Sequence, residues 1–235
     1  MKTMALLALM MLAQGVGAWD FGWSLGVDRL PISQMVQRGM NLDQELEMDF
    51  QGPRHGFSFG LRACRPWRNF NLTLAMERLN HGENLVNWQV ETPGLAVDYQ
   101  GSGAFPAWSA TFSLAYPFAK LREWDLSLQS GLSVMSAQSW LVRHGSFQTE
   151  DQRMEVTTHG VASGLGLGSL NSLILSRKLG QWSLALEAGF RLAHITAKGS
   201  YQEEVQGTTG PAHPLTVDID YDGPFLKMGL LYQNI

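Results

Sequence analysis

The chain has 235 residues, a formal net charge of −4 and a single cysteine, Cys64. Charged residues make up 16% of the chain, whereas about 25% is typical of soluble domains. One cysteine excludes an intrachain disulfide and a zinc site built on several thiolates. The lack of any basic excess argues against nucleic-acid binding.

Residues 1–18 are predicted to be a signal peptide. Lys2 supplies a positive start, residues 4–12 are apolar, and the small residues Val16, Gly17 and Ala18 precede Trp19. We therefore predict cleavage after Ala18 and export of a mature domain spanning residues 19–235. The apolar run is too short to cross a bilayer as a helix, which needs about 20 residues. An N-terminal core helix is the alternative interpretation.

The mature chain repeatedly alternates apolar and small or polar residues. In the segment that starts at Trp182, for example, Leu184 and Leu186 alternate with Ser183 and Ala185. A period of two indicates strands whose two faces meet different environments. The alternation defines eight segments, at residues 19–28, 57–63, 70–77, 108–118, 124–134, about 160–177, 182–192 and 226–232.

The segment at about 160–177 is less regular than the others. Ser169 and Asn171 fall on the otherwise apolar parity, before Leu173 and Leu175 resume it. A β-bulge within residues 169–172 would explain this slip.

The composition of the less apolar face decides which face lies inside. A soluble barrel would carry many charged residues on its wet face, but here that face is mostly Ser, Gly, Thr and Ala. Apolar residues outside and small or polar residues inside are typical of a membrane barrel, and a narrow barrel of eight strands suits small inward residues. A soluble β-sandwich or a lipocalin is the alternative.

The links between these segments alternate in length. Short links lie at about 65–69, 119–123 and 178–181, and long links at about 30–55, 80–105, 139–160 and 195–220. We therefore predict an all-β fold: an eight-stranded, antiparallel, up-and-down transmembrane β-barrel with four long extracellular loops and three short periplasmic turns. Both chain ends then lie on the periplasmic side. An aromatic girdle is expected at that rim, formed by Trp19, Trp67, Tyr116, Phe118, Trp124, Trp182 and Tyr232.

In this pattern of strands and links, the whole mature chain resembles the small outer-membrane β-barrel proteins, the group that includes the OmpA membrane domain and OmpX. The resemblance implies a bacterial outer-membrane location, contact with outer-membrane lipid and lipopolysaccharide, and insertion by the barrel assembly machinery. The chain departs from the group in its ending: Tyr232 stands three positions before the last residue, which is not aromatic.

Five charged residues share the inward parity, and charges inside a narrow barrel should pair because isolated buried charge is costly. We predict an ion-pair network that plugs the barrel; a selective pore is the alternative. The five residues are Asp28, Arg62, Glu77, Glu187 and Arg191.

The pair His144 and Ser146 is the weak candidate for catalysis. Some eight-stranded outer-membrane enzymes that deacylate lipid A carry a His-x-Ser pair with a nearby carboxylate, which Glu150, Asp151 or Glu155 could supply here. A polar extracellular loop is the plainer interpretation. The histidines show no metal-ligand spacing, and residues 164–168 lack the arrangement of a phosphate loop. We expect neither a metal nor a cofactor.

These observations favour a non-enzymatic outer-membrane barrel that contributes to envelope integrity or surface interaction through its long loops. A lipid A-modifying enzyme and a narrow pore for small solutes are the alternatives. The sequence identifies no surface ligand.

Overall fold

The computed structural model describes the backbone of residues 19–29, 35–38, 46–48, 55–81, 84–92, 95–148 and 153–233, and the side chains of residues 19–28, 56–80, 104–146 and 153–233. The predicted signal peptide, residues 1–18, lies outside these ranges. Every described element is a β-strand, and every strand pair is antiparallel.

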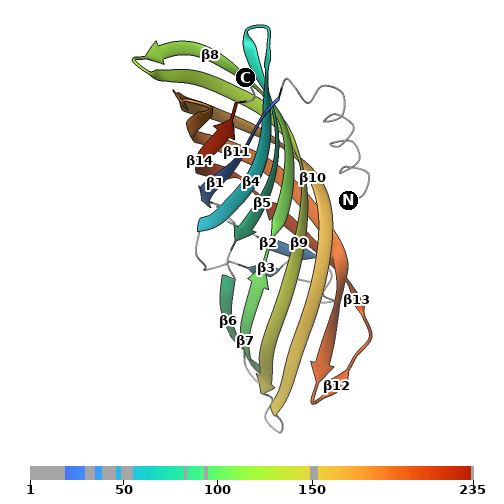
Figure 1. Ribbon diagram of the computed structural model, residues 1–235. Helices are drawn as coiled ribbons and strands as arrows, with labels where there is room; N and C mark the ends of the chain where they lie inside the picture. The colour runs from blue at the N-terminus through green and yellow to red at the C-terminus, as the bar shows by residue number, and fades with distance from the viewer. Residues whose placement is uncertain are drawn as a thin grey trace.

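Eight strands close into a ring, as the alternation predicts (Figure 1). Each strand pairs with the next, and the last pairs with the first through Phe21 and Tyr232. The closed ring has no open edge. A sheet in lipid must be closed in this way because lipid cannot hydrogen-bond to unpaired backbone groups. In ring order the strands are β1 (Asp20–Arg29), β4 (His55–Trp67), β5 (Phe70–His81), β8 (Ala107–Leu121), β9 (Trp124–Gln148), β10 (Arg153–Leu179), β11 (Trp182–Val205) and β14 (Gly223–Tyr232).

The three short links are turns at one end of the ring. Each leaves two residues outside the strands and contains a residue with positive φ: Arg68 (55°), Arg122 (58°) and Gly180 (67°). Such turns match the right-handed twist of the flanking strands. Glycine adopts this conformation readily, whereas the two arginines do so at a steric cost.

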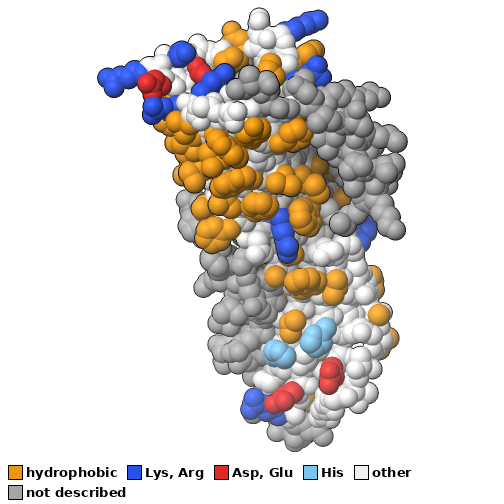
Figure 2. Space-filling model, viewed as in Figure 1, with side chains coloured by type: hydrophobic (Ala, Val, Ile, Leu, Met, Phe, Trp, Pro, Cys, Tyr) orange, Lys and Arg blue, Asp and Glu red, His pale blue; other side chains and the backbone are white. Residues whose placement is uncertain are grey.

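Apolar side chains cover the outside of the ring next to these turns. Phe57, Leu132 and Leu167 are 74%, 71% and 78% exposed, and Figure 2 shows such side chains gathered over the upper part of the molecule. We call this band the belt. Its apolar outer face and the polar interior behind it are the arrangement of an outer-membrane barrel.

The four long links lie where the sequence places them, but their described residues are largely β-structure. The strands β9, β10 and β11 contain 25, 27 and 24 residues, although about 9–11 suffice to cross a bilayer. The remaining strands are β2 (Met35–Arg38), β3 (Leu46–Met48), β6 (Asn84–Thr92), β7 (Leu95–Ala104), β12 (Thr208–Thr209) and β13 (His213–Asp220).

These extensions form a stalk beyond the belt. The stalk comprises residues 135–148, 153–166 and 193–205 of the three long strands, together with the six strands of the long links. Neighbours change at its base: β11 pairs with β14 up to Arg191 and with β13 from His194, and β9 exchanges β8 for β7. Figure 1 shows the long strands continuing past the short strands of the ring.

The apolar face changes sides between the belt and the stalk. Along β11, Phe190 and Leu192 face outward and Arg191 is buried, whereas farther along Ile195 is buried and Thr196 is exposed. The interior of the stalk consequently contains an apolar core, beside the buried polar residues Ser139, Arg143 and Thr158. The apolar core contains Leu79, Phe105, Ala107, Met135, Ala137, Ala162, Ala193, Ile195, Ala197, Tyr201, Leu215, Val217, Ile219 and Tyr221.

The predicted bulge at 169–172 is wrong. β10 keeps one register with β9 from Arg153 to Arg177. Because the register is continuous, Ser169 and Asn171 point outward, on the same face of β10 as Leu173. The irregularity among the ring pairs lies instead between Pro117 and Ala119 of β8.

Glycines let β10 approach β11 closely at the base of the stalk. A Cβ on Gly164 would lie 2.5 Å from the Thr196 carbonyl oxygen, and one on Gly166 would meet the His194 carbonyl. Glycine therefore stands at these inward positions of segment 164–168 because the backbone of β11 leaves no room for a side chain.

Candidate functional site: the charged interior of the barrel

Six charged side chains lie inside the ring at the level of the belt, and all are buried. They comprise the five predicted residues, Asp28, Arg62, Glu77, Glu187 and Arg191, and also Lys227. Strand alternation places them there, because the described neighbours of each residue along its strand face outward. Three carboxylates face three cations, so the cluster is formally neutral.

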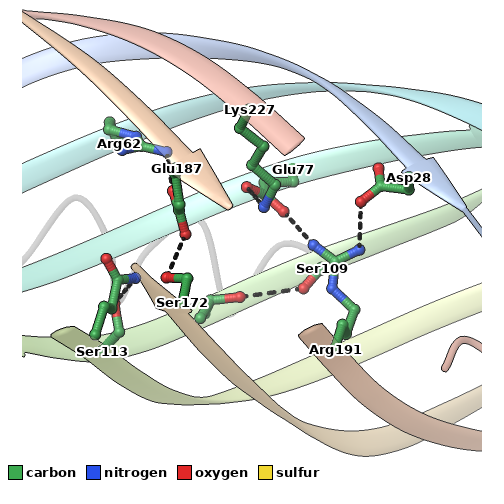
Figure 3. Close-up of polar contacts among 11 residues, drawn as sticks. Asp28, Arg62, Glu77, Ser109, Ser113, Ser172, Glu187, Arg191 and Lys227 are labelled. Atoms are coloured by element: carbon green, nitrogen blue, oxygen red, sulfur yellow. Dashed lines mark hydrogen bonds and ion pairs between the residues drawn. The ribbon is translucent and has the colours of Figure 1, made fainter. Parts of the chain in front are cut away.

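Glu77 is the most heavily engaged member of this cluster (Figure 3). Its Oε2 accepts a hydrogen bond of 2.7 Å from Nη2 of Arg191, and its Oε1 accepts one of 2.6 Å from Nζ of Lys227. One carboxylate thus compensates two buried cations. Charge-assisted bonds of this length are roughly twice as strong as neutral ones.

A second group centres on Glu187. Nη2 of Arg62 donates to its Oε2 at 2.9 Å, and the Ser172 hydroxyl donates to its Oε1 at 2.9 Å. Both carboxylate oxygens are therefore occupied, as a buried carboxylate requires.

Asp28 is less well compensated than the other acids. Its Oδ1 lies 3.7 Å from Nη1 of Arg191, and neither oxygen accepts a hydrogen bond from a described residue. The Nε atoms of Arg62 and Arg191 also lack a described partner. The cluster is electrically balanced but only partly hydrogen-bonded.

These bonds cross the barrel. β5, which carries Glu77, and β11, which carries Arg191, stand four places apart in the ring of eight, so their side chains meet across its full width. The bonds Arg62–Glu187 and Lys227–Glu77 each connect strands three places apart. The lumen is bridged at this level.

The interior is bridged again in the stalk. The Tyr221 hydroxyl donates to the Phe105 carbonyl oxygen at 3.0 Å, and both residues are buried in the apolar core. Burial raises the pKa of this phenol above its ordinary value. Neutral bonds lie at the level of the charged cluster itself: Gln129, which pairs with Ser172, donates to Ser113 at 2.7 Å, and the hydroxyl groups of Ser109, which pairs with Glu77, and Thr111 lie 3.2 Å apart.

Lys227 is the member that the sequence interpretation missed. It stands between Leu226 and Met228, so its parity alone would have predicted an inward position. No local signal indicates that Lys227 and Arg191 share Glu77, because these three residues lie far apart in the chain.

The weak catalytic candidates lie outside the barrel, on the stalk. His144 and Ser146 stand two apart on one face of β9, and Glu155 pairs opposite Ser146 on β10. The His144 Nδ1 lies 3.1 Å from the Thr157 hydroxyl. Among the described contacts, no bond joins His144 to Ser146 or to Glu155.

The predicted aromatic girdle divides into two groups. Trp67, Tyr116, Phe118, Trp182 and Tyr232 are exposed beside the turns, and Trp124 is half-buried. Their rings also contact one another: those of Trp182 and Tyr232 lie 5.2 Å apart, and those of Phe70 and Tyr116 5.6 Å apart. Trp19 differs, with only 8% of its surface exposed.

A polar cluster marks the base of the stalk on its outer surface. His194 Nδ1 lies 2.6 Å from Asp220, its Nε2 lies 3.7 Å from Asp218, and Thr196 donates to Asp218 at 2.6 Å. The hydrogen bond to Asp220 is the main cause that raises the pKa of His194. His194 follows Leu192 on the outward face, so this cluster lies where the belt ends.

Among the described residues, no group of three or more His, Cys, Asp or Glu side chains is arranged to hold a metal ion. No described helix is long and apolar enough to cross a membrane.

Comparison with known proteins supplies likeness of fold alone. No protein-family model matches the sequence, and no curated protein matches it significantly. Among solved structures, Neisserial surface protein A (NspA) is 13% identical, with 91% of this chain and 96% of that chain covered and a TM-score of 0.38. The attachment invasion locus protein Ail of Yersinia pestis is 11% identical (92% and 98% covered, TM-score 0.39). The outer membrane protein OprG of Pseudomonas aeruginosa is 12% identical (92% and 95% covered, TM-score 0.43). The assignment of this chain as a small barrel of the outer-membrane type rests on its own closed ring, its apolar belt and its polar interior.

Proposed function

We propose that the protein is a non-enzymatic barrel of the bacterial outer membrane that holds a rigid β-stalk at the cell surface, where the stalk contributes to envelope integrity and surface contact. One observation carries this proposal: the interior is bridged within the belt by the Glu77–Arg191 pair and is filled by an apolar core beyond it. A filled interior suits a support better than a conduit.

The outer surface of the stalk offers material for contact. His159, Ser163, Lys198 and Gln202 are exposed polar residues, and Trp140 is an exposed aromatic. Trp140 pairs across the strands with Val161, which is also exposed. Exposed aromatics with an apolar neighbour are common anchors of binding surfaces.

Three measurements test the proposal against its alternatives. The purified, folded protein in planar bilayers should give no stepwise conductance, and steps would favour a pore. Mass spectrometry of lipid A should be identical with and without the protein, and a lost acyl chain would favour an enzyme. Cells that lack the protein should take up more of a hydrophobic fluorescent dye; unchanged uptake would contradict a role in envelope integrity.

Surface contact is tested with whole cells and polystyrene beads. Trp140→Ser and Val161→Ser should reduce bead binding, whereas Gln138→Ser, an exposed polar change on the same face of β9, should not. Equal binding by all variants would show that this pair is not a contact site.

A further inference from the structure

A group of uncharged polar side chains interrupts the belt on β9 and β10. On β9 and β10, five outward-facing pairs cross it: Leu126–Leu175, Leu128–Leu173, Ser130–Asn171, Leu132–Ser169 and Val134–Leu167. The middle pair is polar on both strands, and Ser169 adjoins it. On the other six strands, the described outward-facing residues at this level are apolar, such as Leu25 and Phe59, with the exception of Arg78 on β5, whose guanidinium carbon lies 5.7 Å from the centre of the Trp108 ring.

The three polar side chains of this patch are available to a partner. Ser130 and Asn171 are exposed, and Ser169 is half-buried. None of them hydrogen-bonds to another described side chain. The register of β10 shows that they do point outward, so no shift of the strand turns them into the lumen.

Lipid alone cannot satisfy these groups. Hydrocarbon chains neither donate nor accept hydrogen bonds, and an amide transferred from water to such a medium costs roughly 4–8 kcal/mol. The ester and headgroup regions of the bilayer lie at the edges of the belt, whereas Ser130 and Asn171 form its middle pair. Another protein surface is needed to supply donors and acceptors at this depth.

We propose that this face of β9 and β10 binds a second copy of the same chain within the membrane. Two copies inserted in the same direction are related by a two-fold axis along the membrane normal, which keeps every residue at its own depth. Asn171 would then meet the partner's polar patch at equal height. A carboxamide and two hydroxyl groups each both donate and accept, so the patch complements itself.

The geometry also limits the assembly to a dimer. The patch occupies two adjacent strands, and one self-complementary patch permits one contact for each copy. Leu128, Leu132, Leu167 and Leu173 surround it as exposed apolar residues. They supply the packing that accompanies polar contacts between membrane segments.

Cysteine cross-linking in intact membranes tests the contact. In a Cys64→Ser background, Ser130→Cys should form a disulfide-linked dimer on mild oxidation. Leu25→Cys is the matched control, because β1 lies across the ring and its outward face is apolar. Equal cross-linking at both positions, or a Ser130→Cys product of a different mass, would overturn the proposal.

A second measurement does not depend on cysteine chemistry. The dimer fraction in lipid vesicles, counted by single-molecule photobleaching, should fall for Asn171→Leu. The dissociation constant should rise about threefold to thirtyfold, the range that hydrogen bonds between membrane helices span. Leu25→Asn should leave it unchanged. The electrophoretic shift on boiling verifies that each variant is folded, and a wild-type protein that bleaches in single steps would overturn the proposal.

Discussion

The belt and the stalk are built from the same three long strands but solve opposite problems. In the belt, lipid surrounds the barrel, so apolar residues face out and charges pair inside. In the stalk, water surrounds it, so His194, Thr196 and Lys198 face out while Ala193, Ile195 and Ala197 form the core. The backbone pattern does not change between the two regions. What changes is which face of the strand carries the apolar residues.

The comparison shows that alternation of apolar and polar residues identifies a strand but does not identify which of its two faces points into the interior. Period two continues through residues 182–202 of β11, and the only mark of the boundary is that the apolar residues move from even to odd positions after Leu192. Four predictions test this contrast, in order of decreasing effect.

The charged interior should be the most sensitive part of the molecule. Glu77→Ala leaves Arg191 and Lys227 buried without their shared acceptor. Breaking a buried ion pair on one side costs about 3–5 kcal/mol, so urea unfolding in lipid vesicles should shift to markedly lower concentration. The control is Glu123→Ala, which removes the exposed Arg177–Glu123 pair and should cost less than about 1 kcal/mol. Equal losses would mean that the interior is hydrated enough to screen its charges.

The boundary itself can be located on one strand. Leu186→Arg places a cation on the lipid side of β11 near the middle of the belt and should cost about 2–4 kcal/mol. Thr196→Arg, on the same face, should change the free energy of unfolding by less than about 0.5 kcal/mol, because water and Asp218 surround this position. The free energy of unfolding in vesicles measures both. A large cost at position 196 would place the membrane boundary farther along the stalk.

The stalk core should respond as a close-packed interior. Ile195 is fully buried, so Ile195→Val should lower the free energy of unfolding by about 0.5–1.5 kcal/mol, because the missing methylene leaves a cavity. Leu192→Val removes a methylene from the lipid side of the same strand, where lipid chains fill the space, and should cost less. The denaturation midpoints of the two variants give the comparison; the reverse order would refute a packed core.

The smallest effect concerns pH at the base of the stalk. The pKa of His194 is raised in the folded state above its ordinary value of 6.5, so the imidazolium contribution is fully present below that pH and is lost as pH rises through the folded-state value. The group is exposed, so the effect should be a few tenths of a kcal/mol and should weaken with salt. Asp220→Asn should lower the His194 pKa, which NMR titration measures directly. An unaltered titration would show that the hydrogen bond to Asp220 does not form in solution.

Much of the barrel could be predicted from the sequence. The eight segments and three turns follow from local alternation and spacing, which depend on neighbouring residues. The parity of Asp28, Arg62, Glu77, Glu187 and Arg191 also predicts their burial.

The stalk could not be predicted in the same way. The apolar parity changes after Leu192, so the alternation predicts a link at residues 195–220, although these residues contain further strands. The partners of the interior charges were also out of reach, because they depend on which strands face one another across the ring. The sequence predicts a bulge at Ser169 and Asn171 because a polar residue facing lipid contradicts the general rule.

The seam between the first and last strands has a consequence for the order of the chain. Phe21 and Tyr232 are direct neighbours, so the two ends of the barrel meet at the turn side of the ring. A short linker could join them, and the turn at Arg122 could be opened to create new ends without breaking any pair of the ring. The barrel is thus a circle of strand pairings, and a circularly permuted chain that begins at Glu123 should close into the same structure.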